Sequence, residues 1–199
     1  MKRMILMFVF VFYLSTNLIG SVQRTGLRAS ATTVRRFDLE EMVQTAERIF
    51  LGTCLSTGCE RDSLEICTRT SFRVAERIKG TFDADTLVLR LPGGTLDGVR
   101  FSILGMPSFE PGEEVVLFLS AEDEAGYPWV VGLSQGKFSV VLDPLSGKKV
   151  VVNGSSGLAF SSGPLMDQEG VDGIVGVPLD AFLERIRGMV TKKEDVDLR

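Results

Sequence analysis

Apolar and polar residues alternate with a period of two through the middle of the chain, which is the spacing of β-strands. The Pro111-Gly112 dipeptide is typical of a type II turn, because proline presets one backbone position and glycine accepts the positive φ of the next. Short runs bounded by such turns predict a mainly β domain. We expect strands at residues 49–55, 68–75, 86–91, 100–104, 115–119, 129–131, 137–142 and 149–152.

Helical spacing frames this strand region at both ends. Asp38 and Glu41 form a capping box, and Phe37 and Met42 occupy the positions of a hydrophobic staple, so a short helix begins here. Several short strands between two helices predict a small closed antiparallel barrel. The amphipathic C-terminal helix is predicted from apolar residues at Leu179, Phe182, Leu183, Ile186, Met189 and Val190.

The 199 residues are enough for one domain with targeting and terminal segments. Changes of composition divide the chain into successive parts. We predict a signal peptide at 1–21, a linker at 22–36, the barrel domain with its leading helix at 37–153, an irregular Gly/Ser-rich segment at 154–177, the C-terminal helix at 178–191 and a charged tail at 192–199.

The N-terminus has the pattern of an export signal. Lys2 and Arg3 precede an unbroken apolar run from Met4 to Leu14. Those eleven residues are too few to span a bilayer, which takes about 20. We therefore predict an exported protein, located in the periplasm, at the cell surface or outside the cell.

Two cleavage positions follow the apolar run. Gly20 or Ser21 lies at a normal distance from it and is favoured, whereas Ala29-Ser30-Ala31 matches the A-x-A pattern but lies far downstream. A membrane anchor retained through Leu18 and Ile19 is the alternative. Membrane contact is expected only in that case.

The charge balance excludes one class of partner. Asp and Glu number 26 against 22 Lys and Arg, giving a net charge of −4. Phosphate backbones are bound by clustered basic residues, and the basic pairs of this chain are isolated. We expect no nucleic-acid partner.

Three cysteines lie within fourteen residues, and in an exported protein they suggest a disulfide. If Thr57 pairs with Leu64 across a hairpin, Cys54 falls opposite Cys67. Opposed Cβ atoms lie about 4.5–5.5 Å apart and a disulfide needs roughly 3.5–4.5 Å. We predict a Cys54–Cys67 bridge with Cys59 free, and Cys54–Cys59 is the competing pairing.

Gly132-Leu133-Ser134-Gln135-Gly136 matches the G-x-S-x-G nucleophile elbow. That elbow needs a histidine to activate the serine, and the sequence contains none. A Ser134–Lys137 dyad is the remaining catalytic option, against a plain turn between strands. We favour the turn, predict no catalytic residue and do not expect an enzyme.

Metal and cofactor sites are not expected either. The cysteine spacing is not C-x-x-C, and without histidine most zinc sites are impossible. Gly93-Gly94 lacks the Gly-Lys-Ser/Thr ending of a phosphate loop. The carboxylates at Glu110/Glu113/Glu114, Glu122/Asp123/Glu124 and Asp167/Glu169/Asp172 lack the order of a calcium loop, and we interpret them as solvated faces.

Four segments carry a family resemblance, at residues 46–54, 72–80, 107–119 and 131–138. Together they resemble a group of bacterial exported proteins, often found beside matrixin-like metalloproteases. That group is similar in architecture to the OB-fold barrels of netrins and tissue inhibitors of metalloproteinases. The resemblance covers about residues 37–142 and the C-terminal helix.

The resemblance implies an OB-like barrel and a secreted metalloprotease as a partner. Tissue inhibitors bind the protease zinc through a cysteine at the mature N-terminus, whereas Cys54 lies well inside this chain. We therefore predict an exported, non-catalytic, protein-binding module that presents loops 56–66, 92–112 and 121–128 to its partner. The expected partner is a secreted metalloprotease or another envelope protein. The alternative function is that of an inhibitor or assembly partner of a secreted matrixin-like metalloprotease.

Overall fold

The computed structural model describes residues 33–62, 65–153, 159–160 and 175–197. The predicted signal peptide, most of the linker at 22–36 and most of the segment at 154–177 lie outside the described residues. Within the described ranges, no helix has the length and apolar character needed to cross a bilayer.

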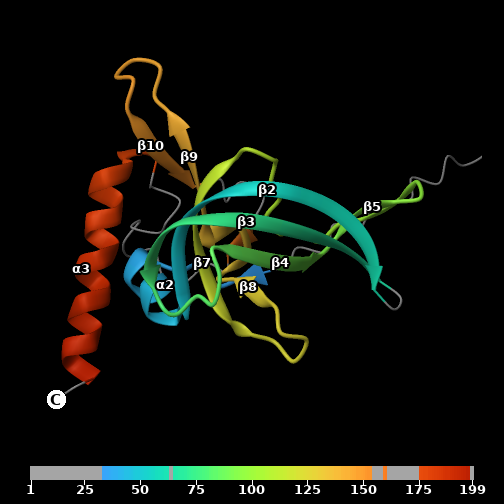
Figure 1. Ribbon diagram of the computed structural model, residues 1–199, viewed down its shortest axis with the longest axis horizontal. Helices are drawn as coiled ribbons and strands as arrows, with labels where there is room; N and C mark the ends of the chain where they lie inside the picture. The colour runs from blue at the N-terminus through green and yellow to red at the C-terminus, as the bar shows by residue number, and fades with distance from the viewer. Residues whose placement is uncertain (1–32, 63–64, 154–158, 161–174, 198–199) are drawn as a thin grey trace, which may run out of the picture. The chain divides into compact units, whose positions relative to one another are not determined.

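The main sheet is antiparallel throughout, in the order β12-β10-β9-β7-β2-β3-β4, with β8 pairing to β7 (Figure 1). The prediction of a mainly β fold with a helix at each end is confirmed. The strands of this sheet are β2 (Arg48–Asp62), β3 (Glu65–Lys79), β4 (Thr86–Pro92), β7 (Glu114–Glu122), β8 (Pro128–Val130), β9 (Lys137–Leu142), β10 (Lys149–Asn153) and β12 (Val175–Pro178).

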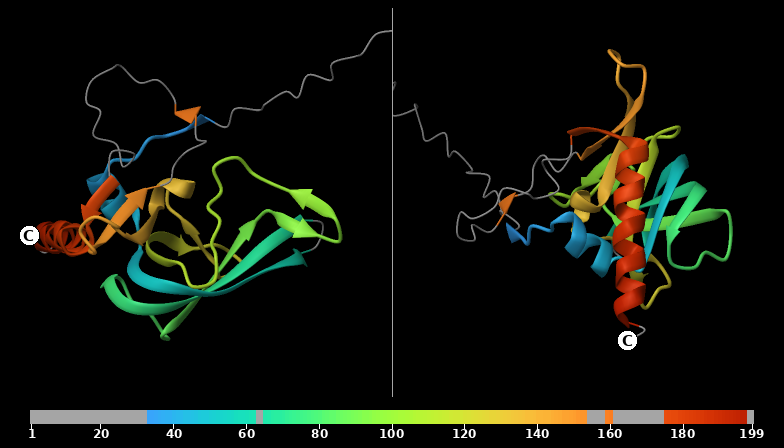
Figure 2. Two further views of the ribbon diagram at one scale, coloured as in Figure 1. Left: turned by 90° about the horizontal axis from the view of Figure 1, so that it is seen from above. Right: turned by 90° about the vertical axis from the view of Figure 1, so that its left-hand side faces the viewer.

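Two short pairs stand apart from the main sheet. Strand β5 (Gly94–Leu96) pairs antiparallel with β6 (Val99–Phe101), and β1 (Thr33–Val34) pairs parallel with β11 (Ala159–Phe160). The β5–β6 ribbon lies near the far end of the β2–β3 hairpin (Figures 1 and 2). It replaces the single strand predicted at 100–104.

The paired sheet is open, ending at β12 and β4, so the predicted closed barrel is not confirmed. Strands β2 and β3 curve strongly (Figure 1), and their register shifts after Ile49, Leu51 and Cys54, as expected where bulges bend a strand. Strand β8 has only three residues. Near it, Arg90 of β4 lies over Tyr127, 5.5 Å from the ring centroid, so side chains approach across the gap between β4 and β8.

Strands β2 and β3 are fifteen residues each, much longer than the predicted strands at 49–55 and 68–75. Their outer arms carry serine, threonine and charged residues, so no apolar alternation marks them in the sequence. The segment predicted as a loop at 56–66 is instead the paired end of this hairpin.

Both faces of the central strands are buried. On β7, Val115, Leu117 and Leu119 point into the hollow of the curved sheet, while Val116 and Phe118 point to the opposite face. All five side chains are 0% exposed. The inner core also contains Phe50, Cys54, Phe72, Val74, Leu87, Leu89, Leu91, Phe109 and Val130.

The second core lies between the sheet and two helices, α2 (Leu39–Thr45) and α3 (Leu179–Asp197), which cover the same side of the sheet (Figures 1 and 2). The predicted capping box of α2 is confirmed, with Asp38 accepting from the Glu41 N–H at 2.7 Å. Helix α3 begins one residue after the predicted start and continues through most of the expected tail. It buries Leu179, Phe182, Leu183, Ile186 and Val190.

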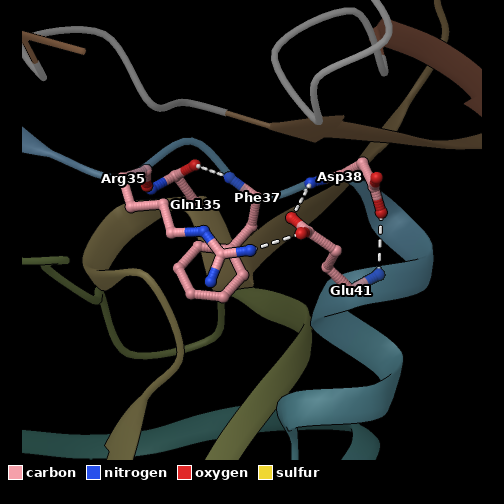
Figure 3. A network of polar contacts seen from close by, with 5 residues as sticks. All are labelled: Arg35, Phe37, Asp38, Glu41 and Gln135. Atoms are coloured by element: carbon pink, nitrogen blue, oxygen red, sulfur yellow. Dashed lines mark hydrogen bonds and ion pairs between the residues drawn. The ribbon is translucent and has the colours of Figure 1, made fainter. Parts of the chain in front are cut away.

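A fully buried glutamine fixes the chain before α2 (Figure 3). The N–H of Phe37 donates to Gln135 Oε1 at 3.0 Å, and Gln135 Nε2 donates to the carbonyl of Arg35 at 3.0 Å. The amide thus bonds this segment as a residue of a parallel strand would. Gln135 Nε2 also donates to Gly132 O at 3.1 Å, and Asn153 Nδ2 donates to the Gln135 carbonyl at 2.6 Å.

Replacing Gln135 with methionine of similar size should lower the free energy of unfolding by about 2–3 kcal/mol, because each buried polar group left unpaired costs about 1–3 kcal/mol. Urea unfolding followed by circular dichroism measures the change. Gln44→Met, on the exposed face of α2, is the matched control and should change stability by less than about 0.5 kcal/mol. Equal unfolding midpoints for the two variants would contradict the anchoring role of Gln135.

Candidate functional site

The hairpin register places the cysteines differently from the prediction. Asp62 pairs with Glu65, so Thr57 pairs with Thr70 rather than Leu64, and Cys54 pairs with Phe72. The predicted opposition of Cys54 and Cys67 is therefore wrong. The prediction was wrong because the polar arms of β2 and β3 are longer than expected, which shifts the pairing of the two strands toward the C-terminus.

All three cysteines are free thiols. Cys54 belongs to the inner core and is 1% exposed, and Cys67 pairs with Glu60. The competing Cys54–Cys59 bridge is also ruled out, because five residues along a strand separate the two by about 15 Å. Cys59 is the half-buried thiol, and it pairs across the hairpin with Thr68.

Cys59 faces a cleft of about 490 Å³ at the mouth of the curved sheet, hereafter the mouth cleft. Strands β2, β3 and β4 supply one wall, and the β5–β6 ribbon with the following loop supplies the other. The lining residues are Thr57, Cys59, Thr68, Thr70, Leu91, Pro92, Gly93, Gly94, Thr95, Arg100, Phe101, Ser102, Ile103, Met106, Pro107, Ser108 and Phe109.

Glycine allows the ribbon to lie close to Cys59. A Cβ on Gly94, whose φ is +137°, would lie 2.6 Å from Cys59 Sγ and 2.8 Å from Thr68 Oγ1. The N–H of Thr95 donates to Cys59 Sγ at 3.4 Å. At the other end of the ribbon, Asp97 forms an ion pair with Arg61 of β2 at 3.8 Å. The ribbon is therefore held to the main sheet at both ends.

The sequence contains a hairpin signal for this ribbon, although the ribbon does not show in the apolar periodicity. Leu96 pairs with Val99 across the two-residue turn Asp97-Gly98, and both turn residues have positive φ, 52° and 76°. Asp-Gly between two apolar residues is among the strongest short-range hairpin signals. Recognising it would have replaced the strand predicted at 100–104 with a hairpin.

A second surface is the β9–β10 hairpin, which projects from the sheet (Figure 1). Its turn is fixed by Asp143, whose carboxylate accepts from the N–H groups of Leu145 and Ser146 at 3.2 and 3.1 Å. The side chain of Ser146 and the backbone N–H of Leu145 hold the pKa of Asp143 below its ordinary 3.8. On this rigid turn Leu145 is 96% exposed, and Leu142 beside it is 66% exposed.

A cleft of about 570 Å³ adjoins the hairpin. Within it, Lys137 Nζ lies 2.7 Å from Glu113 Oε1 and donates to the carbonyl of Ser108 at 2.6 Å. Ser139 Oγ also donates to Glu113, at 2.7 Å. Nearer the hairpin, Lys149 pairs with Glu114 at 2.7 Å. The cleft is thus lined by paired charges on one side and by residues 140–142 on the other.

The G-x-S-x-G match forms a turn between strands, as expected, in the 3₁₀-helix Leu133–Gly136 that joins β8 to β9. The N–H of Ser134 donates to Gly105 O at 3.0 Å, and its buried Oγ has no hydrogen-bond partner in the described structure. Lys137 Nζ is engaged by Glu113 and Ser108, which leaves the Ser134–Lys137 dyad without support. The residue with a clear role in this motif is Gln135.

The other predicted loops differ in what they present. In the loop at 121–128, Asp123 accepts from the N–H of Tyr127 and from Trp129 Nε1, both at 3.0 Å, so its carboxylate organises the turn. The loop at 92–112 exposes apolar Val99, Phe101 and Leu104 beside the mouth cleft. Among the described residues, no three His, Cys, Asp or Glu side chains gather closely enough to hold a metal ion.

No protein-family model matches the chain, and no curated protein matches its sequence. The resemblance to exported proteins with netrin-like barrels therefore stays a prediction. The candidate functional surfaces of the described structure are the β9–β10 hairpin and the mouth cleft.

Iodoacetamide should alkylate Cys59 about tenfold faster than Cys54 or Cys67, because burial restricts access and raises the pKa of the latter two thiols. Peptide mass spectrometry of the native full chain at successive times measures the three rates. Alkylation in denaturant, where the rates should converge, is the control. Faster modification of Cys54 in the native protein would contradict the register described here.

The Asp143 turn should weaken only at acidic pH. A lowered pKa means that its hydrogen bonds contribute fully above pH 3.8 and are lost as the pH falls through the folded-state value. The amide chemical shifts of Leu145 and Ser146, followed by NMR, should therefore titrate with a midpoint below 3.8. Asp143→Asn should abolish this titration, and a midpoint above 3.8 in the parent chain would contradict the assignment.

Proposed function

We propose that this chain is an exported, non-catalytic, protein-binding module that contacts its partner through the β9–β10 hairpin. The observation that carries the proposal is Leu145, a large apolar side chain that is 96% exposed on a turn fixed by Asp143. Water contact with such a side chain is unfavourable by about 1.5–3 kcal/mol relative to burial. Binding a partner would recover that free energy.

The turn also lowers the entropic cost of binding. Asp143 N–H and O bond to Lys148 O and Gly147 N, both at 2.8 Å, in addition to the bonds made by its carboxylate. A loop already held in one conformation loses little freedom when a partner covers it. Exposed apolar residues on a hairpin that is already held in one conformation therefore support a binding role.

The hairpin and its surroundings have the composition of a protein–protein interface. Leu142 and Val141, which is 43% exposed, extend the apolar surface from Leu145 toward the adjoining cleft. The Lys149–Glu114 pair borders them. An apolar centre with a polar edge is the usual composition of protein–protein contacts. The partner surface should accordingly offer an apolar pocket with polar groups at its margin.

For the scaffold, we infer an OB-like barrel that is completed by side chains rather than by a continuous backbone ladder. The Arg90–Tyr127 contact between β4 and the loop before β8 supports this proposal. Export rests on the basic and apolar pattern of the N-terminal segment, with Lys2 and Arg3 before the apolar run.

A secreted matrixin-like metalloprotease remains the proposed alternative partner. Chelation of its zinc by Cys54, in the manner of the tissue inhibitors, is disfavoured because that thiol is buried inside the sheet and only 1% exposed. Inhibition or assembly would have to use another contact, and the hairpin is the surface we propose for it.

The decisive experiment is a pull-down with the full chain from the culture supernatant and envelope fraction of its own host. A partner should be retained by the parent chain and lost from the double variant Leu142→Ser/Leu145→Ser, by about tenfold or more, since buried apolar anchors dominate binding. Leu55→Ser, at a 40% exposed position on β2, is the matched control and should retain the partner.

Retention that is unchanged in the hairpin variant would contradict this surface. If a metalloprotease is recovered and its activity falls in the complex, the inhibitor alternative is favoured over a plain binding module. Failure of the folded parent chain to retain any protein would reject the protein-partner proposal.

A further inference from the structure

The mouth cleft differs in charge from the chain as a whole. The sequence carries more acidic than basic residues, 26 against 22, yet among the residues that the structure describes no Asp or Glu lines this cleft. Arg100, on β6, is the one charged residue that lines the cleft within the described part of the chain. The local environment is therefore positive within an acidic protein, which favours an anionic ligand.

Arg100 is also unlike its neighbours in having no acidic partner. Arg61 pairs with Asp97 and Arg90 pairs with Glu60, whereas Arg100 forms no ion pair within the described part of the chain. A guanidinium presents a planar set of donors that matches a carboxylate. At the edge of a cleft this group is available to an incoming anion.

The rest of the lining combines apolar and hydroxyl groups. Leu91 and Phe109, which belong to the inner core, form its floor and are 4% and 7% exposed, and Met106 packs against that core. Along the β2–β3 wall lie the side chains of Thr57, Thr68 and Thr70. Such a lining suits a ligand with an apolar body and few polar atoms.

We propose that the mouth cleft binds a small amphipathic carboxylate, with its anionic head at Arg100 and its apolar body against Leu91, Met106 and Phe109. The cleft volume of about 490 Å³ lies within the range of small-molecule sites. This ligand site is distinct from the protein-binding hairpin: Ser108 lines both the mouth cleft and the cleft beside the hairpin, but no residue of β9 or β10 lines the mouth cleft.

Cys59 provides a reporter inside the cleft. Octanoate is the probe, at concentrations below micelle formation, and octan-1-ol is the neutral probe with the same apolar chain. The rate of Cys59 alkylation by iodoacetamide is measured on the native full chain at increasing concentrations of each. Bound octanoate should slow Cys59 alkylation with a saturable dependence on concentration, while octan-1-ol should require about tenfold more, because it lacks the charge that Arg100 recognises.

Arginine variants identify the site of the anionic head. Arg100→Gln should weaken protection by octanoate about tenfold and leave protection by octan-1-ol unchanged. Arg73→Gln, at an exposed arginine on β3 outside the cleft lining, is the matched control and should behave as the parent. Circular dichroism verifies that both variants are folded.

Three results would overturn the proposal. Octanoate could leave the rate of Cys59 alkylation unchanged, octanoate and octan-1-ol could protect equally in the parent chain, or Arg100→Gln could leave protection by octanoate unaltered. Each is independent of the hairpin pull-down, so the ligand site and the protein-binding function stand or fall separately.

Discussion

The structure depends on burying β7 from both sides at once. Five consecutive apolar residues, Val115–Leu119, have no solvent-exposed surface, so one face of the sheet must be hollowed and the other must be covered. Curvature of β2 and β3 satisfies the first requirement, and α2 with α3 satisfies the second. A strand with one solvent-exposed face would need only one of these two arrangements. The fold is thus a response to one continuous hydrophobic strand.

Both candidate surfaces lie where this double burial ends. Strand β9 pairs with β7 only as far as Val140, which lies opposite Glu114. Beyond that pair, the β9–β10 hairpin extends into solvent without β7 beside it. Toward the far ends of β2 and β3, the apolar residues of the inner core are followed by threonines and by Cys59, which line the mouth cleft. The core holds these margins in place, and they carry the exposed leucines and Arg100, which forms no ion pair within the described residues.

How far the sequence predicts the structure depends on the range of the interaction. The Asp38–Glu41 cap is local and was predicted, and the alternating strands were placed because one face of each is apolar. The predicted pairing of the cysteines was wrong because the polar arms of β2 and β3 show no apolar periodicity that would fix the register. The role of Gln135 was not predictable from periodicity, since its partners at Arg35 and Phe37 lie about a hundred residues away in the sequence. The mouth cleft, built from three separate segments, was equally inaccessible.

The packing of α3 against α2 has a consequence for biosynthesis. Leu39, Met42 and Val43 share the second core with Phe182 and Ile186, which leave the ribosome much later. At about 5–20 residues per second, α2 is synthesised roughly 7–30 seconds before the residues of α3 that complete its core. During that interval the second core is incomplete, so the apolar face of α2 and the adjoining face of the sheet stay exposed until α3 has been synthesised.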